Sequence, residues 1–245
     1  MITTDITFPA DGGRPMRAAY AAPPDSQKQP GGQKVPGLIV IHEIFGLNDD
    51  IRRITGRVAD LGYAALAPDL YDRDGVRLIC IARTLLTLSR GEGDAFKDLD
   101  AARKFLQQQP GVDAARIGVI GFCMGGGFAL MYAARAPLGV AATFYGDVPK
   151  TTEQLRGVCP VLGGYGGQDR MFAAQGRRLE NLLTEMGIDH DVKIYEDAGH
   201  SFISRNRGFL PWIGRIGPMK AAYNPEAAED SWKRIEAFFG RHLGH

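Results

Sequence analysis

Cysteine is scarce in this sequence, and its number is odd. The 245 residues include only three, Cys80, Cys123 and Cys159. A sparse, odd-numbered set argues against a disulfide framework and favours free thiols in a reducing compartment. The first residues, MITTDITFPADGG, lack the basic region and apolar run of a secretory signal peptide. We therefore expect a cytoplasmic protein.

Long hydrophobic runs and an excess of charge are also missing. Gly, Arg or Asp interrupts the longest apolar stretches before they reach the roughly 20 residues that a membrane-spanning helix needs. The 29 basic and 28 acidic side chains nearly cancel, which argues against a nucleic acid or an anionic membrane as partner. A small-molecule ligand fits this balance better.

Sequence signatures of cofactor binding are absent too. The His, Cys and Asp residues are not at metal-ligand spacing. Neither a P-loop nor a dinucleotide-binding fingerprint occurs, because the segment GGYGGQD leads to Asp169 and not to a helix start of the required spacing. We therefore expect no metal and no cofactor.

What the sequence does contain is a regular pattern of apolar segments. Hydrophobic residues make up 44% of the chain, which is enough for one sizeable core, so we predict a single domain over residues 1–245. Ile2–Phe8 and Met16–Ala22 alternate in hydrophobicity around a Gly-Gly turn and predict an antiparallel hairpin. Pro23–Pro36 and Ser201–Asn224 have the composition of loops.

Beyond the hairpin, strand-like and helix-like segments alternate. Short apolar runs predict strands that are buried on both faces: Leu38–His42, Tyr63–Ala67, Arg116–Gly121, Val140–Phe144, Val161–Tyr165 and Asp191–Tyr195. Helical spacing predicts helices in the segments between and after them: Asp49–Leu61, Arg77–Ser89, Asp94–Gln108, Met124–Arg135, Met171–Met186 and Glu226–Leu243. This order predicts an α/β fold with a mostly parallel central sheet, an antiparallel N-terminal part and helices on both faces.

One predicted strand-to-helix junction has the residues of a nucleophile turn. The segment GFCMGG, with Cys123 at its centre, has the form Gly-x-nucleophile-x-Gly. A side chain at Gly121 or Gly125 would collide with neighbouring backbone in so sharp a turn, and the nucleophile itself is strained. The helix that starts at Met124 directs its amide dipoles at the sulfur, which favours thiolate over thiol. The alternative is a buried, inert cysteine in a glycine-rich turn.

A cysteine nucleophile needs a base, and the base needs an orienting group. His200 follows the last predicted strand, and Asp169 follows the strand before it. Both therefore lie at the carboxyl edge of the sheet, where open α/β sheets form their sites, in the chain order nucleophile, acid, histidine of the α/β-hydrolase fold. The alternatives are a surface histidine and a turn-forming aspartate. Asp197 lies too close in sequence to His200 to orient it.

Several segments resemble the dienelactone hydrolase family, also called carboxymethylenebutenolidases. They are HEIFGLN at 42–48, APDLY at 67–71, GFCMGG around Cys123, GGQD ending at Asp169, AGHSF around His200 and the closing AAEDSWKRIEAFF. The resemblance implies an α/β-hydrolase fold. It also implies a hydrolase that cleaves an ester or enol-lactone carbonyl through a Cys123–His200–Asp169 triad and an acyl-enzyme.

The resemblance implies further site residues. Glu43 would contact the resting cysteine and help to generate the thiolate when substrate binds, and the backbone N–H groups of Ile44 and Met124 would form the oxyanion hole. These positions agree with physical expectation, since one donor should follow the nucleophile and the other should lie after the first core strand. Without the resemblance, Glu43 is better explained as a helix cap or as a partner of Arg52 or Arg53 than as a site residue.

Arginines bear on whether the substrate carries a carboxylate. Family enzymes that hydrolyse dienelactone bind the substrate carboxylate with arginines. Here Arg73, Arg77, Arg205 and Arg207 lie near the predicted site, but none aligns with the family pattern without a shift. The alternative is that they are solvated loop charges, so carboxylate recognition stays open.

Two other functions stay open at this point. One is a general carboxylesterase or thioesterase without a preference for lactones. The other is a thiol-based sensor or a ligand-binding relative without turnover, because an exposed reactive thiol is also a target of oxidation. A sensor needs a resolving cysteine, but Cys159 is predicted at the opposite edge of the sheet from Cys123, and Cys80 in a helix. Hydrolysis is therefore the leading prediction, while the natural substrate, the oligomeric state and a lid role for residues 201–224 stay open.

Overall fold

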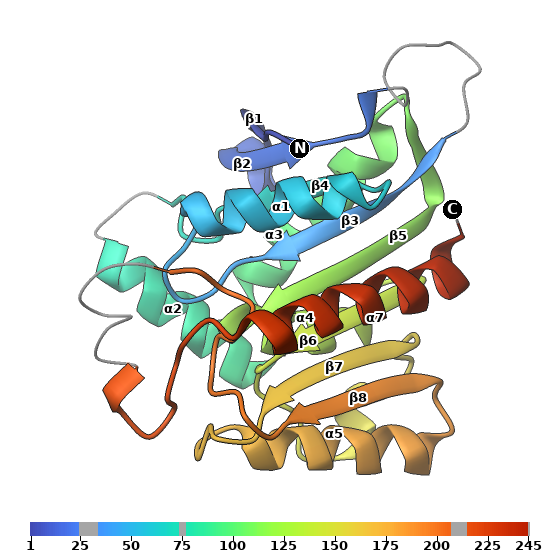
Figure 1. The fold of residues 1–245 in the computed structure, drawn as a ribbon. Coiled ribbons are helices and arrows are strands. Elements are labelled where there is room, and N and C mark those ends of the chain that lie inside the picture. Colours follow the sequence, from blue (N-terminus) through green and yellow to red (C-terminus); the bar gives the residue numbers. More distant parts are fainter. Residues whose placement is uncertain (25–33, 74–76, 207–214, 245) are drawn as a thin grey trace. The chain divides into compact units, whose positions relative to one another are not determined.

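The computed structural model of the protein describes residues 1–24, 34–73, 77–206 and 215–244 (Figure 1). The strands are β1 (Thr4–Pro9), β2 (Pro15–Ala21), β3 (Val35–Ile41), β4 (Ala64–Pro68), β5 (Val112–Phe122), β6 (Val140–Phe144), β7 (Val161–Gly166) and β8 (His190–Tyr195). The helices are α1 (Asp49–Asp60), α2 (Arg77–Arg90), α3 (Asp94–Gln108), α4 (Met124–Ala133), α5 (Ala173–Met186) and α7 (Pro225–Leu243), with short 3-10 helices η1 (Asp11–Gly13) and η3 (Thr152–Leu155).

The strands lie in the order β1-β2-β4-β3-β5-β6-β7-β8. β2 pairs antiparallel with β1 and β4, whereas β3 with β4, β6 with β7, and β7 with β8 pair in parallel. The predicted α/β class and the mostly parallel sheet with an antiparallel start are confirmed. The chain forms two compact units, Met1–Ile120 with Leu243–His245, and Gly121–His242. The single domain over residues 1–245 stays a prediction.

In the first unit, helices cover β3 and β4, which are buried almost throughout. Helix α1 packs against β2, β3 and β4, and α3 packs against β3 and β4. Figure 1 shows α1 in front of these strands and α3 behind them. Cover on both faces explains why the strands are continuous apolar runs. Asn48 begins α1 as its N-cap, because its side chain accepts the Ile51 N–H at 3.0 Å.

In the second unit, α4 packs against β6, and α5 packs against β7 and β8. Every residue of α4 is buried, as expected of a helix that is apolar on all sides. Gly187 ends α5 in the left-handed conformation, with a φ of 65°. Glycine suits this C-cap position, because residues with a Cβ adopt the left-handed conformation at a cost.

Two strands begin three or more residues earlier than the sequence pattern predicts. β5 begins at Val112 and not at Arg116, and β3 begins at Val35, inside the predicted loop. The side chain of Asp113 accepts hydrogen bonds from the Ala115 N–H and from Arg116 Nε. Polar and small residues with local bonds of this kind do not alternate in hydrophobicity, so the pattern did not reveal the start of β5.

Parts of the two predicted loops lie outside the described residues, namely 25–33 and 207–214. Among the helices that the structure describes, none is both long enough and apolar enough to cross a membrane.

Candidate active site

Cys123 occupies the turn between β5 and α4 in a conformation that residues with side chains rarely adopt. Its φ is 54° and its ψ is −120°, which is strained for any residue other than glycine. The Cys123 N–H donates to the Phe144 carbonyl at 2.9 Å, and the Cys123 carbonyl accepts from the Gly126 N–H at 2.9 Å. The side chain remains partly exposed. The strained turn predicted around Cys123 is therefore present.

Glycine is required on both sides of this turn. A Cβ added at Gly121 would lie 1.9 Å from the Gly125 carbonyl oxygen, and one added at Gly126 would lie 2.7 Å from Thr143 Oγ1. The collision predicted at Gly121 is confirmed, while the one predicted at Gly125 stays a prediction. Because the obstacle at Gly121 is backbone, a side chain there would displace the turn that presents the sulfur.

His200 and Asp169 form a buried pair. Asp169 Oδ2 lies 2.6 Å from His200 Nδ1, and the two side chains are 0% and 4% exposed. The other carboxylate oxygen, Oδ1, accepts the N–H groups of Met171 and Phe172 at 3.0 and 3.2 Å. Both oxygens of the carboxylate are therefore held. The carboxylate in turn places the proton on Nδ1 of the neutral imidazole and leaves Nε2 as the basic nitrogen.

The backbone of His200 is supported by the far end of the predicted 201–224 loop. The His200 N–H donates to the Met219 carbonyl at 2.9 Å, and the His200 carbonyl accepts from the Ala222 N–H at 3.1 Å. Gly199 makes this approach possible, because an added Cβ would lie 1.9 Å from the Lys220 carbonyl oxygen. Residues 217–224 thus position the histidine, whereas residues 207–214, on which a lid role depends, lie outside the described residues.

The surroundings of His200 favour its protonated form. Burial by itself lowers the imidazole pKa, but the hydrogen bond to Asp169 and the interactions with Cys123 outweigh it and raise the pKa to about 10. Nε2 is buried and makes no hydrogen bond of standard geometry to any residue that the structure describes. The raised pKa and the absence of such a hydrogen bond are both explained by a sulfur atom that lies close to Nε2 but is poorly aligned with it. Such geometry is common in catalytic sites before substrate binds.

Two aromatic rings contact the imidazole, and sequence reasoning missed both. The ring centroids of Tyr145 and Phe172 lie 5.0 and 4.9 Å from that of His200. Tyr145 comes directly after β6, and Phe172 comes directly before α5. Their places at the carboxyl ends of β6 and β7 were a usable signal, because the chemistry of this fold gathers at that edge. Neither residue type suggests catalysis by itself, so the pattern of polar residues did not include them.

Glu43 and Ile44 belong to the first unit. Glu43 is buried at 2% exposure, while Ile44 is 38% exposed. His42 supports this segment, since its Nδ1 lies 2.7 Å from the Glu43 carbonyl and its Nε2 accepts the Leu70 N–H at 3.1 Å. Met124, the other predicted oxyanion donor, is the first residue of α4 in the second unit. That Glu43 and Ile44 act on Cys123 stays a prediction.

The two arginines proposed as alternative partners of Glu43 have other partners. Arg52 pairs with Asp5 at 3.0 Å, and Arg53 pairs with Asp50 at 2.6 Å. The cap of α1 is Asn48. Asn48 thus fills the cap position, while a pairing of Glu43 with Arg52 or Arg53 stays an alternative.

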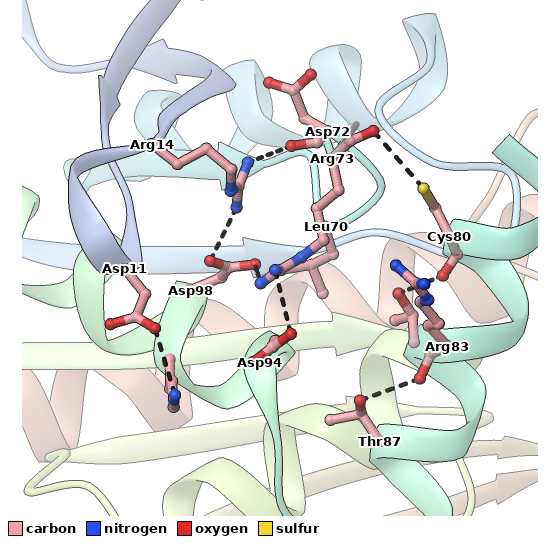
Figure 2. A network of polar contacts seen from close by, with 12 residues as sticks. Asp11, Arg14, Leu70, Asp72, Arg73, Cys80, Arg83, Thr87, Asp94 and Asp98 are labelled. Atoms are coloured by element: carbon pink, nitrogen blue, oxygen red, sulfur yellow. Dashed lines mark hydrogen bonds and ion pairs between the residues drawn. The ribbon is translucent and has the colours of Figure 1, made fainter. Parts of the chain in front are cut away.

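The arginines considered for carboxylate recognition have different surroundings. Figure 2 shows Arg73 extended toward Asp98 and Asp94, with which it forms ion pairs. Arg205 donates to the Tyr223 hydroxyl at 2.8 Å and lies over the Tyr223 ring. The side chain of Arg77 and the whole of Arg207 lie outside the described residues. Arg73 is thus already paired with two aspartates of the first unit.

The other two cysteines do not have the features of redox partners. Burial raises the pKa of the Cys159 thiol to about 12, which suppresses its thiolate. Cys80 is buried at 2% exposure, and its thiol lies 3.7 Å from the Arg73 carbonyl oxygen. In the described parts of the chain, no group of three or more His, Cys, Asp or Glu residues could hold a metal ion.

Comparisons with known proteins identify relatives of this chain. The model of the dienelactone hydrolase family matches residues 18–243. A proposed carboxymethylenebutenolidase of Methylorubrum extorquens is 33% identical over 98% of this chain and 81% of its own length, and one of Saccharolobus solfataricus is 31% identical over 97% and 98%. A dienelactone hydrolase-like promiscuous phosphotriesterase, P91, from metagenomic libraries is similar in structure, with a TM-score of 0.78, 27% identity and full coverage of both chains.

Proposed function

This chain belongs to the dienelactone hydrolase family and is a hydrolase, and on that premise we propose that it cleaves an ester or enol-lactone carbonyl with Cys123, His200 and Asp169. The single observation that carries the proposal is the buried Asp169–His200 pair at 2.6 Å, whose imidazole interacts with the strained, partly exposed Cys123. Covalent acyl transfer requires these three groups, namely a nucleophile, a base and an acid that orients the base.

In the proposed first half-reaction, the Cys123 sulfur attacks the carbonyl carbon and forms a C–S bond. The carbonyl oxygen takes up the electron pair and then returns it as the C–O bond to the leaving group breaks. His200, whose pKa is raised to about 10, is protonated at neutral pH and donates that proton to the leaving oxygen. An enol leaving group needs this help least, which favours enol lactones over unactivated esters.

In the second half-reaction, water releases the acyl group. His200 Nε2 removes a proton from the water, the resulting hydroxide attacks the thioester carbonyl, and the C–S bond breaks to regenerate the thiolate and the imidazolium. Asp169 stays ionised throughout and stabilises the imidazolium. In the proposed oxyanion hole, the N–H groups of Met124 and Ile44 stabilise the oxyanion by about 3 kcal/mol per donor. Glu43 is proposed to contact the resting Cys123 and to take part in forming the thiolate.

A general carboxylesterase or thioesterase is the second candidate, and one observation favours it. Arg73, an arginine considered for binding a substrate carboxylate, is paired with Asp94 and Asp98. A substrate without a carboxylate needs no such arginine. Relative kcat/KM values on enol lactones with and without a carboxylate, and on matched esters and thioesters, distinguish the candidates.

The nucleophile is tested by replacement and by trapping. Cys123→Ala should lose at least about a thousandfold in kcat on a chromogenic ester, since the residual rate of such variants comes only from the oxyanion hole and substrate binding. Intact-mass spectra after exposure to a panel of enol lactones should show one acyl adduct on the wild type and none on the variant. Full activity of Cys123→Ala would end the proposal.

A further inference from the structure

Tyr145 is a wholly buried residue held in a strained backbone conformation. Its φ is 45° and it is 0% exposed. Its N–H donates to the Gly164 carbonyl of β7 at 2.8 Å. A bulky side chain at positive φ is strained and persists only where the surroundings enforce it. The location of this strain, one residue beyond β6 and against His200, points to a constraint on where the phenol lies.

The phenol ring is in contact with both His200 and the residues that follow it. Its centroid lies 5.0 Å from the imidazole, with 55° between the ring planes. On another side it meets Phe202 edge to face, at 5.3 Å and 73°. Phe172 contacts the imidazole too, at 4.9 Å. The imidazole is therefore in contact with the rings of Tyr145 and Phe172, and the Tyr145 ring is itself in contact with Phe202.

The phenol hydroxyl ties the end of β6 to the loop that carries His200. It lies 3.0 Å from Ser204 Oγ, and either hydroxyl can donate in this hydrogen bond. Ser204 is 3% exposed, and its N–H donates to the Ser201 carbonyl at 3.0 Å. Ser201 has a φ of 56°. The turn from residue 201 to residue 204 thus brings a serine hydroxyl back to the phenol beside the imidazole.

We propose that Tyr145 and Ser204 are positioning residues that hold the His200 imidazole at the angle needed for proton transfer at Cys123. This inference rests on the proposed function. The bond to Asp169 fixes the position of Nδ1 but still allows the ring to swing, and catalysis needs the angle held to about 10–20°. Both side chains are buried, so they act through His200 and not on the substrate. The hydrogen bond between them keeps the phenol against the imidazole.

The test removes one hydroxyl at a time. Tyr145→Phe keeps the ring and Ser204→Ala keeps the backbone turn. Each should lower kcat about fivefold to tenfold, the scale of one lost buried hydrogen bond, and should change KM less than about twofold. The double variant should lose no more than the worse single variant, because both changes remove the same bond. Tyr165→Phe removes the hydroxyl of another wholly buried tyrosine, on β7, and should leave kcat unchanged.

A second readout separates positioning from a purely structural role. A looser imidazole interacts less well with Asp169 and Cys123, and these interactions are what raise its pKa. The alkaline limb of kcat/KM should therefore move to lower pH in Tyr145→Phe and Ser204→Ala, and should stay in place in Tyr165→Phe.

The outcomes distinguish this inference from the proposed function. If Cys123→Ala is inactive while both hydroxyl variants keep the wild-type kcat and pH profile, the positioning role is wrong and the nucleophile stands. Additive losses of kcat in the double variant also overturn the positioning role, as does an alkaline limb of kcat/KM that stays at the same pH in the single variants. A fully active Cys123→Ala overturns the proposed function itself. Thermal melts accompany each variant, and Ser204→Ala alone decides the matter if Tyr145→Phe does not fold.

Discussion

Two aspartates with completely buried side chains, Asp98 in the first unit and Asp169 in the second, have opposite kinds of surroundings. Asp98 lies between two guanidinium groups, those of Arg14 and Arg73 (Figure 2). Those groups bind further acceptors, since Arg14 donates to the Asp72 carbonyl and Arg73 to Asp94. Asp169 instead binds the His200 imidazole and two backbone N–H groups, and the other imidazole nitrogen has no bond of standard geometry within the described chain.

The two sites also differ in whether burial or attraction between charges determines the direction of the pKa shift. Burial raises the pKa of Asp98, and the two arginines offset only part of that rise. At His200 burial also disfavours the charge, yet Asp169 and Cys123 outweigh it and raise the pKa to about 10. A buried carboxylate that is paired with two arginines contributes to structure. A chain of groups that ends in a nitrogen beside a sulfur atom is suited to moving a proton.

The largest expected difference between the two aspartates is in activity. Asp169→Asn should lower kcat by about 10³–10⁴, because the amide cannot stabilise an imidazolium and favours the wrong tautomer of His200. Steady-state kinetics on a chromogenic ester measure this loss of kcat. Asp197→Asn, an exposed aspartate three residues from His200, is the matched control and should retain nearly full activity. An equal loss in both variants would remove Asp169 from the triad.

The next largest effect should be on stability, at Asp98. Asp98→Ala leaves two guanidinium groups without their shared partner and should lower the free energy of unfolding by about 3 kcal/mol, the low end for a broken buried pair, because both arginines keep some exposure. Urea denaturation measures this value. The folded variant should keep its kcat, and a loss of kcat as large as that of Asp169→Asn would contradict the division of roles.

The pH dependence of stability gives a third comparison. The pKa of His200 is raised in the folded protein to about 10 from an ordinary value of 6.5. Its stabilising contribution should therefore be fully present below about pH 6.5 and lost as the pH rises toward 10. Urea titrations at several pH values measure the free energy of unfolding of the wild type and of His200→Gln. The difference between the two free energies should become smaller as the pH rises across this range. A difference that widens with pH would mean that the imidazole is buried neutral.

The smallest effect is expected at Asp94, the more exposed of the two aspartates that pair with Arg73. Asp94 is 64% exposed where it pairs with Arg73. Asp94→Asn should therefore lower the free energy of unfolding by less than about 1 kcal/mol, since exposed ion pairs are screened by water. Measured beside Asp98→Ala, it separates the buried from the exposed part of one network. Equal losses at both positions would show that burial does not set the cost.

Much of the site could be predicted because its chemistry depends on residue types at strand ends. The GFCMGG turn identified Cys123 and the clash at Gly121. The positions of Asp169 and His200 after consecutive strands predicted that they meet, and they do, at 2.6 Å. The position of Tyr145 after β6 was a usable signal for its contact with His200. Its hydrogen bond to Ser204 could not be predicted, because the two residues are far apart in sequence and only folding brings them to 3.0 Å.

By itself, the sequence determined the order of strands and helices, the glycines that permit a sharp turn and the residue types that can act as nucleophile, base and acid. These follow from local sterics and periodicity, which operate over a few residues. The tertiary structure alone decided that Arg73 pairs with Asp98, that residues 217–224 hold His200 and that the pKa of its imidazole is high. These depend on distances between segments remote in the chain and on the removal of water, which no local pattern records.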